Sequence, residues 1–207
     1  MTTDWLTRAL EESRARGYLG PGAVAPHITH AEGFALAWEA RFITPPTSFL
    51  DLGSGGGLPG LVLLQRWNCH GTLNDSITKR LQFLQEVLDW PGAPSFGHVM
   101  PGRAEEMARQ EEFDSAFDLV VARSFGPPAV TAECAARFLA VGGVLIVSEP
   151  PDDDETGRWS EDGLRRLGLT SLGRTRQGAA YQVVQKVHTT PSTFPREVGM
   201  PKKKPLF

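Results

Sequence analysis

Residues 49–60 read Phe-Leu-Asp-Leu-Gly-Ser-Gly-Gly-Gly-Leu-Pro-Gly, and an apolar run follows at residues 61–64. Glycine lacks a Cβ atom, so such a turn can be tight and can let a ligand lie against the backbone. Exposed N–H groups at the start of the following helix favour a carboxylate or a phosphate. Five glycines would each cost backbone entropy if the turn only joined a strand to a helix. The stretch therefore predicts a strand, a ligand-binding turn and a helix.

Short apolar runs alternate with helical patterns downstream of this turn. The predicted strands are residues 48–51, 71–75, 96–100, 117–122 and 143–148, and the predicted helices are residues 60–65, 79–88, 103–110 and 128–139. Such alternation is typical of an α/β protein with a mostly parallel sheet and helices on both faces. After a helix near residues 161–167, residues 169–174 and 180–187 face each other across Gly178 and predict a C-terminal antiparallel hairpin. We therefore expect a Rossmann-like sheet of seven strands.

The regions on either side of the predicted sheet divide the chain into three parts. Residues 1–44 form an N-terminal helical extension, with one helix ending near Gly17, a linker at residues 20–26 and a second helix over residues 31–42. Residues 45–188 form the ligand-binding domain. Residues 189–207, rich in proline and lysine, form a basic tail that we expect to be loop or extended chain.

Composition narrows the class of protein further. The chain of 207 residues has a formal net charge of −3, so its overall field does not attract nucleic acid and any phosphate binding must be local. Cys69 and Cys134 lie far from any metal-binding pattern and are expected to be buried free thiols, with neither a disulfide nor a metal site. No secretory signal and no membrane-spanning run is recognisable, which favours a cytoplasmic protein.

Two acidic residues bear on which ligand the turn binds. The spacing Gly55-x-Gly57-x-x-Gly60 also fits a dinucleotide fingerprint, and a single match to that pattern is weak. Asp75 ends the second predicted strand, where an acid can bind both ribose hydroxyls of either cofactor; the alternative is a helix N-cap. Asp51, just before the first glycine, fits a cationic aminoacyl group better than a pyrophosphate. Together with the closing hairpin, this favours S-adenosylmethionine and a class I methyltransferase fold.

Five blocks of sequence then point to one family. They are Asp51-Leu-Gly-Ser-Gly-Gly-Gly-Leu-Pro-Gly60, Leu73-Asn-Asp-Ser76 with Lys79-Arg-Leu-Gln-Phe-Leu84, Arg103-Ala-Glu-Glu106, Val121-Ala-Arg-Ser-Phe125, and the tail Phe194-Pro-Arg-Glu-Val-Gly-Met-Pro-Lys-Lys-Lys-Pro-Leu206. In these blocks the chain resembles the RsmG (GidB) family, which methylates guanine N7 in small-subunit ribosomal RNA. It differs from the family at Ser148-Glu149, where a lysine-glycine pair is usual.

The resemblance implies S-adenosylmethionine as the cofactor and assigns roles to individual residues. The cofactor residues that it implies, together with Asp51 and Leu58, are Gly53, Gly55 and Gly57 at the methionine part, Asp75 at the ribose, and Ala104 and Glu105 at the adenine edge. Arg123 is expected beside the donor and the incoming base, as the catalytic residue; the alternative is a surface arginine paired with an acid. Guanine N7 has a free lone pair, so the reaction needs no general base.

The tail supplies the clearest basic cluster. Arg196, Lys202, Lys203 and Lys204 are expected to bind RNA phosphates in a salt-dependent way, with a merely solvated tail as the alternative. Ribosomal RNA or the small ribosomal subunit is then the expected partner. Two other functions stay open: a small-molecule methyltransferase, favoured by the acidic residues 152–155, and a non-catalytic protein that keeps the cofactor pocket.

Overall fold

The computed structural model describes residues 5–67, 69–151 and 157–207, so the acidic stretch noted above at 152–155 lies outside the described residues. The strands are β1 (Ser48–Leu52), β2 (His70–Asp75), β3 (Gly97–Pro101), β4 (Phe117–Ala122), β5 (Leu139–Glu149), β6 (Leu169–Gln177) and β7 (Ala179–Lys186). The helices are α1 (Trp5–Ala15), α2 (Ala25–Glu39), α3 (Gly60–Arg66), α4 (Thr78–Leu88), α5 (Ala104–Met107), the 3₁₀ turn η1 (Glu111–Phe113), α6 (Pro128–Ala136), α7 (Glu161–Arg166) and α8 (Met200–Lys203).

The strands form one seven-stranded sheet in the order β3-β2-β1-β4-β5-β7-β6. Strands β1 to β5 pair in parallel, whereas β7 runs antiparallel to both β5 and β6. The expected mostly parallel sheet and C-terminal hairpin are confirmed. Strand β1 lies between β2 and β4, with Asp51 opposite both Leu73 and Val121. The chain therefore leaves the carboxyl ends of β1 and β4 at adjacent points, where open α/β sheets bind ligands.

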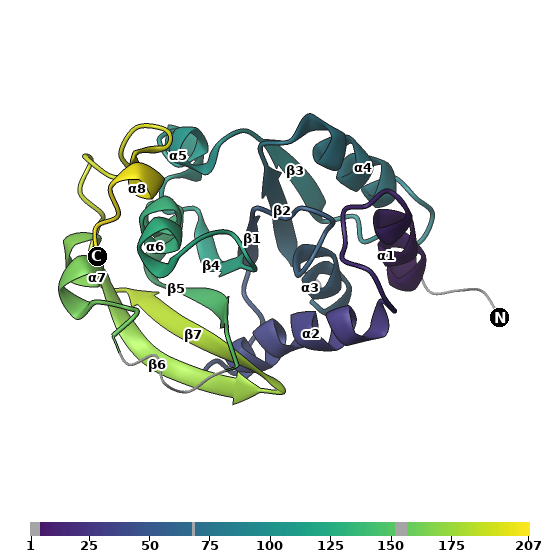
Figure 1. Cartoon of the computed structure of the whole chain (residues 1–207), viewed down its shortest axis with the longest axis horizontal. Coiled ribbons are helices and arrows are strands. Elements are labelled where there is room, and N and C mark those ends of the chain that lie inside the picture. The colour runs from purple at the N-terminus through teal and green to yellow at the C-terminus, as the bar shows by residue number, and fades with distance from the viewer. Residues whose placement is uncertain (1–4, 68, 152–156) are drawn as a thin grey trace.

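Alternate residues of each strand face opposite layers of helices, as the pleat of a strand requires. Phe49 packs in a cluster with α1 to α4, and its neighbour Leu50 packs in a second cluster with α5, α6 and α7. Figure 1 shows these two groups of helices on the two faces of the sheet. Both faces of the central strands are thus buried, which explains their nearly continuous apolar sequences.

The N-terminal helices belong to the first of these clusters. Leu10 of α1 and Phe34 of α2 are fully buried together with Phe49 of the sheet. Helix α2 begins at Ala25 and not near residue 31, so the predicted linker over residues 20–26 is too long. Proline is tolerated in the first turn of a helix, where its missing N–H has no intrahelical partner, and Pro26 occupies such a position.

Further boundaries differ from the sequence-based expectation. The predicted helix over residues 128–139 ends at Ala136, and the one over residues 103–110 ends at Met107. Strand β5 begins at Leu139 and not at residue 143, because Leu139 pairs with Phe117 before an irregularity at the glycines that follow. The tail, expected to be loop or extended chain, contains the short helix α8. Phe194 of the tail is buried in the second cluster, so the tail is packed on the protein. No helix among residues 5–67, 69–151 and 157–207 is long and apolar enough to cross a membrane.

Candidate active site

The glycine-rich turn, residues 53–59, is folded back on the end of β1 by hydrogen bonds within the chain. The Gly60 N–H donates to Asp51 Oδ2 at 2.8 Å, and the Ser54 N–H donates to the Asn74 carbonyl at 2.7 Å. Gly57 has a φ of +100°, and a Cβ atom there would lie 2.4 Å from Leu61 Cδ1. Gly57 is therefore required for close packing of the turn on α3.

Asp75, at the carboxyl end of β2, is joined directly to this turn. Its Oδ2 accepts a hydrogen bond from the Gly55 N–H at 3.0 Å, and its Oδ1 accepts one from the Ile77 N–H at 2.8 Å. The Arg80 guanidinium lies 3.5 Å from Oδ2. Each carboxylate oxygen keeps a second lone pair, and the side chain borders a cavity. The geometry allows Asp75 to accept hydrogen bonds from a ligand as well as from the backbone.

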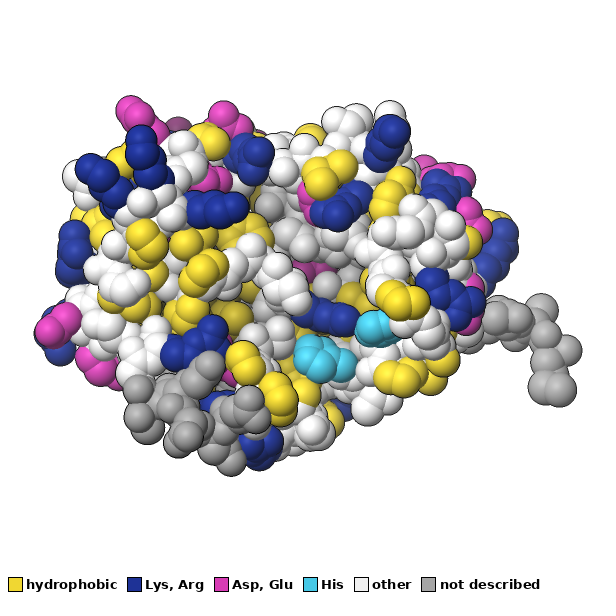
Figure 2. All heavy atoms as spheres, in the orientation of Figure 1, with side chains coloured by type: hydrophobic (Ala, Val, Ile, Leu, Met, Phe, Trp, Pro, Cys, Tyr) yellow, Lys and Arg dark blue, Asp and Glu magenta, His cyan; other side chains and the backbone are white. Residues whose placement is uncertain are grey.

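Three cavities meet beside Arg123 and Ser124. One of about 390 Å³ lies between the ends of β2, β3 and α8; one of about 240 Å³ lies along the glycine turn; one of about 430 Å³ lies between α2 and the end of β5. Ser124 borders all three, and Arg123 borders the second and third. Figure 2 shows this face hollowed, with arginine and histidine side chains bordering the hollow.

The structure brings most of the predicted cofactor residues to the first two cavities. Gly53, Asp75, Ala104 and Glu105 border the cavity of 390 Å³, whereas Gly53, Gly55 and Leu58 border that of 240 Å³. Gly55 has a φ of +56° and borders the cavity along the turn, and a Cβ atom there would make only an ordinary contact, at 3.8 Å, with the Gly53 carbonyl oxygen. The backbone at this position is thus open for a ligand to lie against. Gly57 and Asp51 border neither cavity.

Asp51 is instead fully buried beneath the turn. Its Oδ1 has no hydrogen-bond partner, and burial raises the pKa of the carboxyl to about 7, against the opposing effect of the Gly60 N–H. A buried carboxylate with an unpartnered oxygen is costly unless a positive charge lies near it. The ammonium group of an aminoacyl ligand, acting directly or through a water, fits that requirement.

Arg123 follows β4 and points to the glycine turn from the neighbouring strand. Its Nη2 donates to His27 Nδ1 at 3.1 Å, and its Nη1 is buried without a hydrogen-bond partner. Desolvation lowers the pKa of Arg123, although the negative charge of Asp51 acts in the opposite direction. Within the part of the chain that the structure describes, no carboxylate lies within salt-bridge distance of Arg123. The guanidinium thus has donors left for a ligand.

The tail closes one side of the cavity of 390 Å³. Arg196 donates through its backbone and side chain to Glu133, which is fully buried on α6. The Gly199 N–H donates to Glu105 Oε1 at 3.0 Å, and Lys202 borders the same cavity. Arg196 therefore serves to hold the tail in place. The side chains of Lys202, Lys203 and Lys204 are exposed.

Sequence reasoning quoted Ser124 and Phe125 within motifs but gave them no role. Ser124 has a φ of +55°, an uncommon conformation for a residue other than glycine, at the meeting point of the three cavities. Phe125 lies against Gly53, where a Cβ atom would come within 2.7 Å of its ring. Ser13 of α1, also missed, donates to the Gly56 carbonyl at 2.8 Å. The N-terminal helix thus supports the glycine turn, a contact without any local sequence signal.

The cysteines are free and buried, as expected. Among the described residues no group of three or more histidine, cysteine, aspartate or glutamate side chains could hold a metal ion. The two cavities bordered by Asp75 and the glycine turn, together with the unpartnered Oδ1 of Asp51, fit an adenosine joined to a charged aminoacyl group. The residues present therefore fit S-adenosylmethionine.

Comparison with known proteins also indicates a methyltransferase. The family model for GidB, "rRNA small subunit methyltransferase G", matches residues 36–154. The chain is 32% identical over 164 residues to Ribosomal RNA small subunit methyltransferase G of Fervidobacterium nodosum, covering 76% of each chain. It is 30% identical over 185 residues to the protein of the same name from Moorella thermoacetica, covering 86% of this chain and 77% of that one.

A solved structure supports the fold independently. The SAH-bound methyltransferase PaMTH1 of Podospora anserina aligns with a TM-score of 0.58 at 13% identity, covering 90% of this chain and 89% of that one. At that identity the likeness concerns the class I methyltransferase fold alone, which it confirms. The chain therefore belongs to the GidB family, rRNA small subunit methyltransferase G, and is, as predicted, a methyltransferase that uses S-adenosylmethionine.

Proposed function

We propose that this methyltransferase transfers a methyl group from S-adenosylmethionine to N7 of a guanine in small-subunit ribosomal RNA. The observation that carries the proposal is that all three cavities share Ser124 and two of them also share Arg123, since two cavities suit the donor and the third, of about 430 Å³, has room for a base. The names of the relatives, which are ribosomal RNA methyltransferases, support RNA as the substrate. A small-molecule substrate is not favoured. An RNA substrate of this kind also agrees with a cytoplasmic protein.

In this proposal the adenosine and methionine parts of the donor lie in two different cavities, each bordered by predicted cofactor residues. Asp75 accepts hydrogen bonds from the ribose hydroxyls, while Ala104 and Glu105 lie at the adenine edge. Gly53, Gly55 and Leu58 contact the methionine part through their backbone and the leucine side chain. Gly57 borders neither cavity and shapes the turn through its packing on α3.

Asp51 and Arg123 act on the charged end of the donor. The carboxylate of Asp51 neutralises the ammonium group, through a water if the buried side chain keeps its position. The free donors of Arg123 reach either the donor's carboxylate or the incoming base. These contacts fix the donor's orientation, which is the main contribution that an enzyme makes to an in-line methyl transfer.

The base is methylated without prior loss of a proton. When bound, the donor supplies a methyl group on a sulfonium, and the lone pair of guanine N7 forms the new N–C bond as the C–S bond breaks. Because N7 is already unprotonated, the site has only to align the ring and exclude water. Ser124 and Arg123 stand between the donor cavities and the base cavity and are placed to do so.

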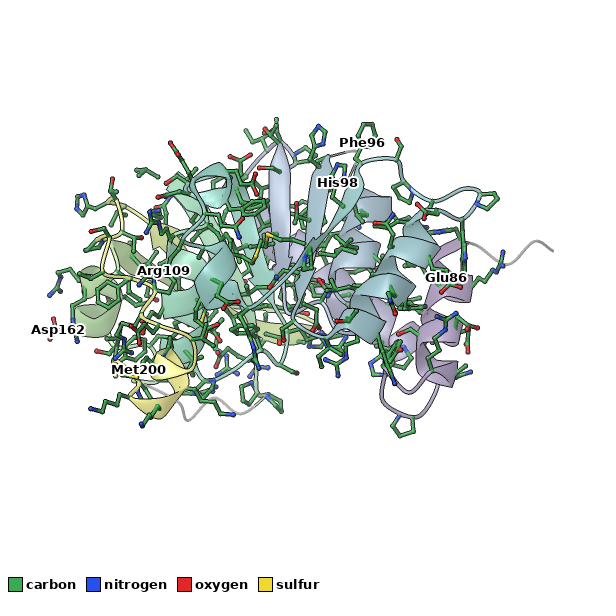
Figure 3. The ribbon with its side chains drawn as sticks, turned by 90° about the horizontal axis from the view of Figure 1, so that it is seen from above. Glu86, Phe96, His98, Arg109, Asp162 and Met200 are labelled. Carbon is green, nitrogen blue, oxygen red and sulfur yellow. The ribbon has the colours of Figure 1, made fainter. Side chains whose placement is uncertain are left out.

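The tail brings a phosphate-binding surface to this cleft. Lys202, Lys203 and Lys204 are exposed on and after α8, and Lys202 also borders the cofactor cavity. Figure 3 shows Met200 of α8 on the same side as Arg109, whose Nη2 donates to the Pro195 carbonyl at 2.5 Å and helps to hold the tail. We assign the three lysines to RNA phosphates and Arg196 to the support of that surface.

The experiment supplies the purified protein with methyl-labelled S-adenosylmethionine and one of three acceptors: small ribosomal subunits from a strain lacking the enzyme, naked ribosomal RNA, or a panel of metabolites. We expect label in the RNA or the subunits, and strong loss of label with Asp75→Ala and with Arg123→Ala. Label only in a metabolite would overturn the RNA substrate. Binding of the donor without any transfer would indicate a non-catalytic protein.

A further inference from the structure

The hydrogen bond between Arg123 and His27 joins the reaction site to helix α2. Arg123 Nη2 and His27 Nδ1 are 3.1 Å apart, although the residues are separated by 96 positions in the sequence. For the residues that the structure describes, His27 is the sole hydrogen-bond partner of this guanidinium, since Nη1 is buried without one. The orientation of Arg123 thus depends on a residue that the cofactor and RNA assignments do not use.

The chemistry of the two side chains decides which of them donates. An arginine stays protonated and can only donate, so Nδ1 of His27 must accept. The imidazole is then neutral, with its proton on Nε2. Desolvation lowers the pKa of His27, and the charge of Arg123 lowers it further, which keeps the imidazole neutral near neutral pH. Protonation of Nδ1 would remove the acceptor and place two cations side by side.

Contacts with β7 fix helix α2 close to His27, so the position of His27 relative to Arg123 is fixed as well. The hydroxyl of Tyr181 on β7 donates to the His30 carbonyl at 2.5 Å, one turn after His27. The Tyr181 ring also packs against Phe34 of α2, with centroids 4.8 Å apart. His27, on this anchored helix, can therefore fix the orientation of the Arg123 side chain.

We propose that His27 is a positioning residue, which in its neutral form holds the Arg123 guanidinium at the junction of the base and methionine cavities. The proposal rests on the role given to Arg123 under the proposed function. Acid then weakens turnover by releasing Arg123, in a pH range set by the imidazole of His27. The sequence around His27 and His30 indicates ordinary surface histidines, and the contact with Arg123 is what distinguishes His27.

Other titratable groups surround the same guanidinium. His30 lies one turn along α2, and its Nδ1 is buried without a partner. Asp51 of β1 and Tyr181 of β7 both interact electrostatically with Arg123. Glu149 and Arg158 border the base cavity. The experiment must therefore assign the acid effect to His27 and not to these neighbours.

The test measures kcat on ribosomal RNA with both substrates saturating, from about pH 5 to 8. His27→Asn places Oδ1 where Nδ1 of histidine lies and keeps an acceptor that does not titrate, whereas His27→Ala removes it. His98→Asn is the matched control, because His98 is exposed on β3, on the opposite side of the molecule from Met200 in Figure 3.

We expect wild-type kcat to fall as pH drops through the pKa of His27, and His27→Asn to lack this fall while it keeps most of its activity near neutral pH. His27→Ala should have a kcat roughly tenfold to a hundredfold below that of the wild type at neutral pH, since a hydrogen bond to a charged group and its alignment are lost, and its kcat should not follow the acid fall of the wild type. His98→Asn should follow the wild type.

Two results would overturn the proposal: full activity of His27→Ala at neutral pH, or an acid fall of kcat that is as large in His27→Asn as in the wild type. Failure of the proposed function looks different. In that case Arg123→Ala itself retains kcat, whatever the His27 variants do.

Discussion

The Gly55 N–H donates to Asp75 Oδ2 at 3.0 Å, so the glycine turn after β1 and the acid that ends β2 form one hydrogen-bonded unit. The unit places the turn, in a left-handed conformation at Gly55, beside the carboxylate expected to bind the ribose. Anything that displaces the turn therefore also disturbs the carboxylate. Cofactor affinity should be sensitive to the backbone of Gly55 although its side chain is a hydrogen atom.

Gly55→Ala should weaken cofactor binding more than it weakens folding. The added methyl group strains a residue with a φ of +56° by about 1 to 2 kcal/mol, and it adds bulk at a residue that borders the cavity along the turn. Gly178→Ala is a matched control: Gly178 has a φ of +75° and open space around it, but it lies in the distal hairpin. Calorimetric titration with S-adenosylhomocysteine and denaturant unfolding of both variants separate the two effects. Equal cofactor affinity in the two variants contradicts the assignment.

Asp51 should give the protein a characteristic dependence of stability on pH. Its carboxyl has a pKa of about 7 in the folded chain against 3.8 for the ordinary group. Between these values the folded chain binds more protons than the unfolded chain, so this stabilisation is complete below about pH 4 and is lost as pH rises to 7 and above. The full change is on the order of 4 kcal/mol.

Asp51→Asn, which cannot titrate, is the reference for this measurement. Chemical unfolding of both proteins at several pH values should show the wild type losing stability relative to the variant as pH rises. His27 and His30 titrate in both proteins, so their contributions cancel in the difference. A difference that does not change with pH means that the pKa of the Asp51 carboxyl is the same in the folded and the unfolded chain.

Arg196→Ala should destabilise the tail strongly because it leaves the carboxylate of Glu133 buried and unpaired. The exposed fraction of the Glu133 side chain is 0%, and breaking a buried pair of this kind costs about 3 to 5 kcal/mol. Arg165→Ala, which breaks the exposed pair with Asp162 on α7, should cost no more than about 1 kcal/mol. Denaturant unfolding compares the two. Similar losses in both variants would mean that the Glu133 pair does not hold the tail.

Removing Lys203 and Lys204 together should weaken RNA binding without loss of cofactor affinity. Both side chains are exposed, and neither borders the cofactor cavity, whereas Lys202 does. If each lysine neutralises one phosphate, the slope of log affinity against log salt should fall by roughly 0.7 to 0.9 for each. Arg165→Ala and Arg166→Ala on α7 provide the control. An unchanged slope means that the tail lysines remain in solvent when RNA binds.

Local patterns predicted much of this site. The glycine turn and Arg123 each follow a predicted strand and Asp75 ends one, and the carboxyl ends of neighbouring parallel strands necessarily meet at one edge of the sheet. The pattern of apolar residues was therefore enough to predict that these three features lie at the same edge of the sheet. The seven-stranded sheet and its closing hairpin were predictable in the same way, because the alternation of strand and helix patterns along the chain indicates a sheet covered by helices.

Contacts between distant parts of the chain were not predictable in this way. The pairing of Arg123 with His27 joins residues 96 positions apart, and that of Arg196 with Glu133 joins residues 63 positions apart. The sequence around His27 or Glu133 gives no indication of either pairing. The full burial of Asp51 follows from packing of α3 over β1, and helix α8 forms in a segment whose prolines and lysines indicate a loop. Tertiary packing, which pattern reasoning does not describe, decides each of these.

The central claim is that the site formed by the glycine turn, Asp75 and Arg123 methylates guanine N7. Ribosomal RNA labelled by the protein in the presence of methyl-labelled S-adenosylmethionine is digested to nucleosides, and the labelled product is identified by chromatography and mass spectrometry. We predict a single labelled product, 7-methylguanosine, which is absent with Arg123→Ala. Label recovered in a methylated adenosine or in a ribose 2′-O-methyl nucleoside would contradict the account.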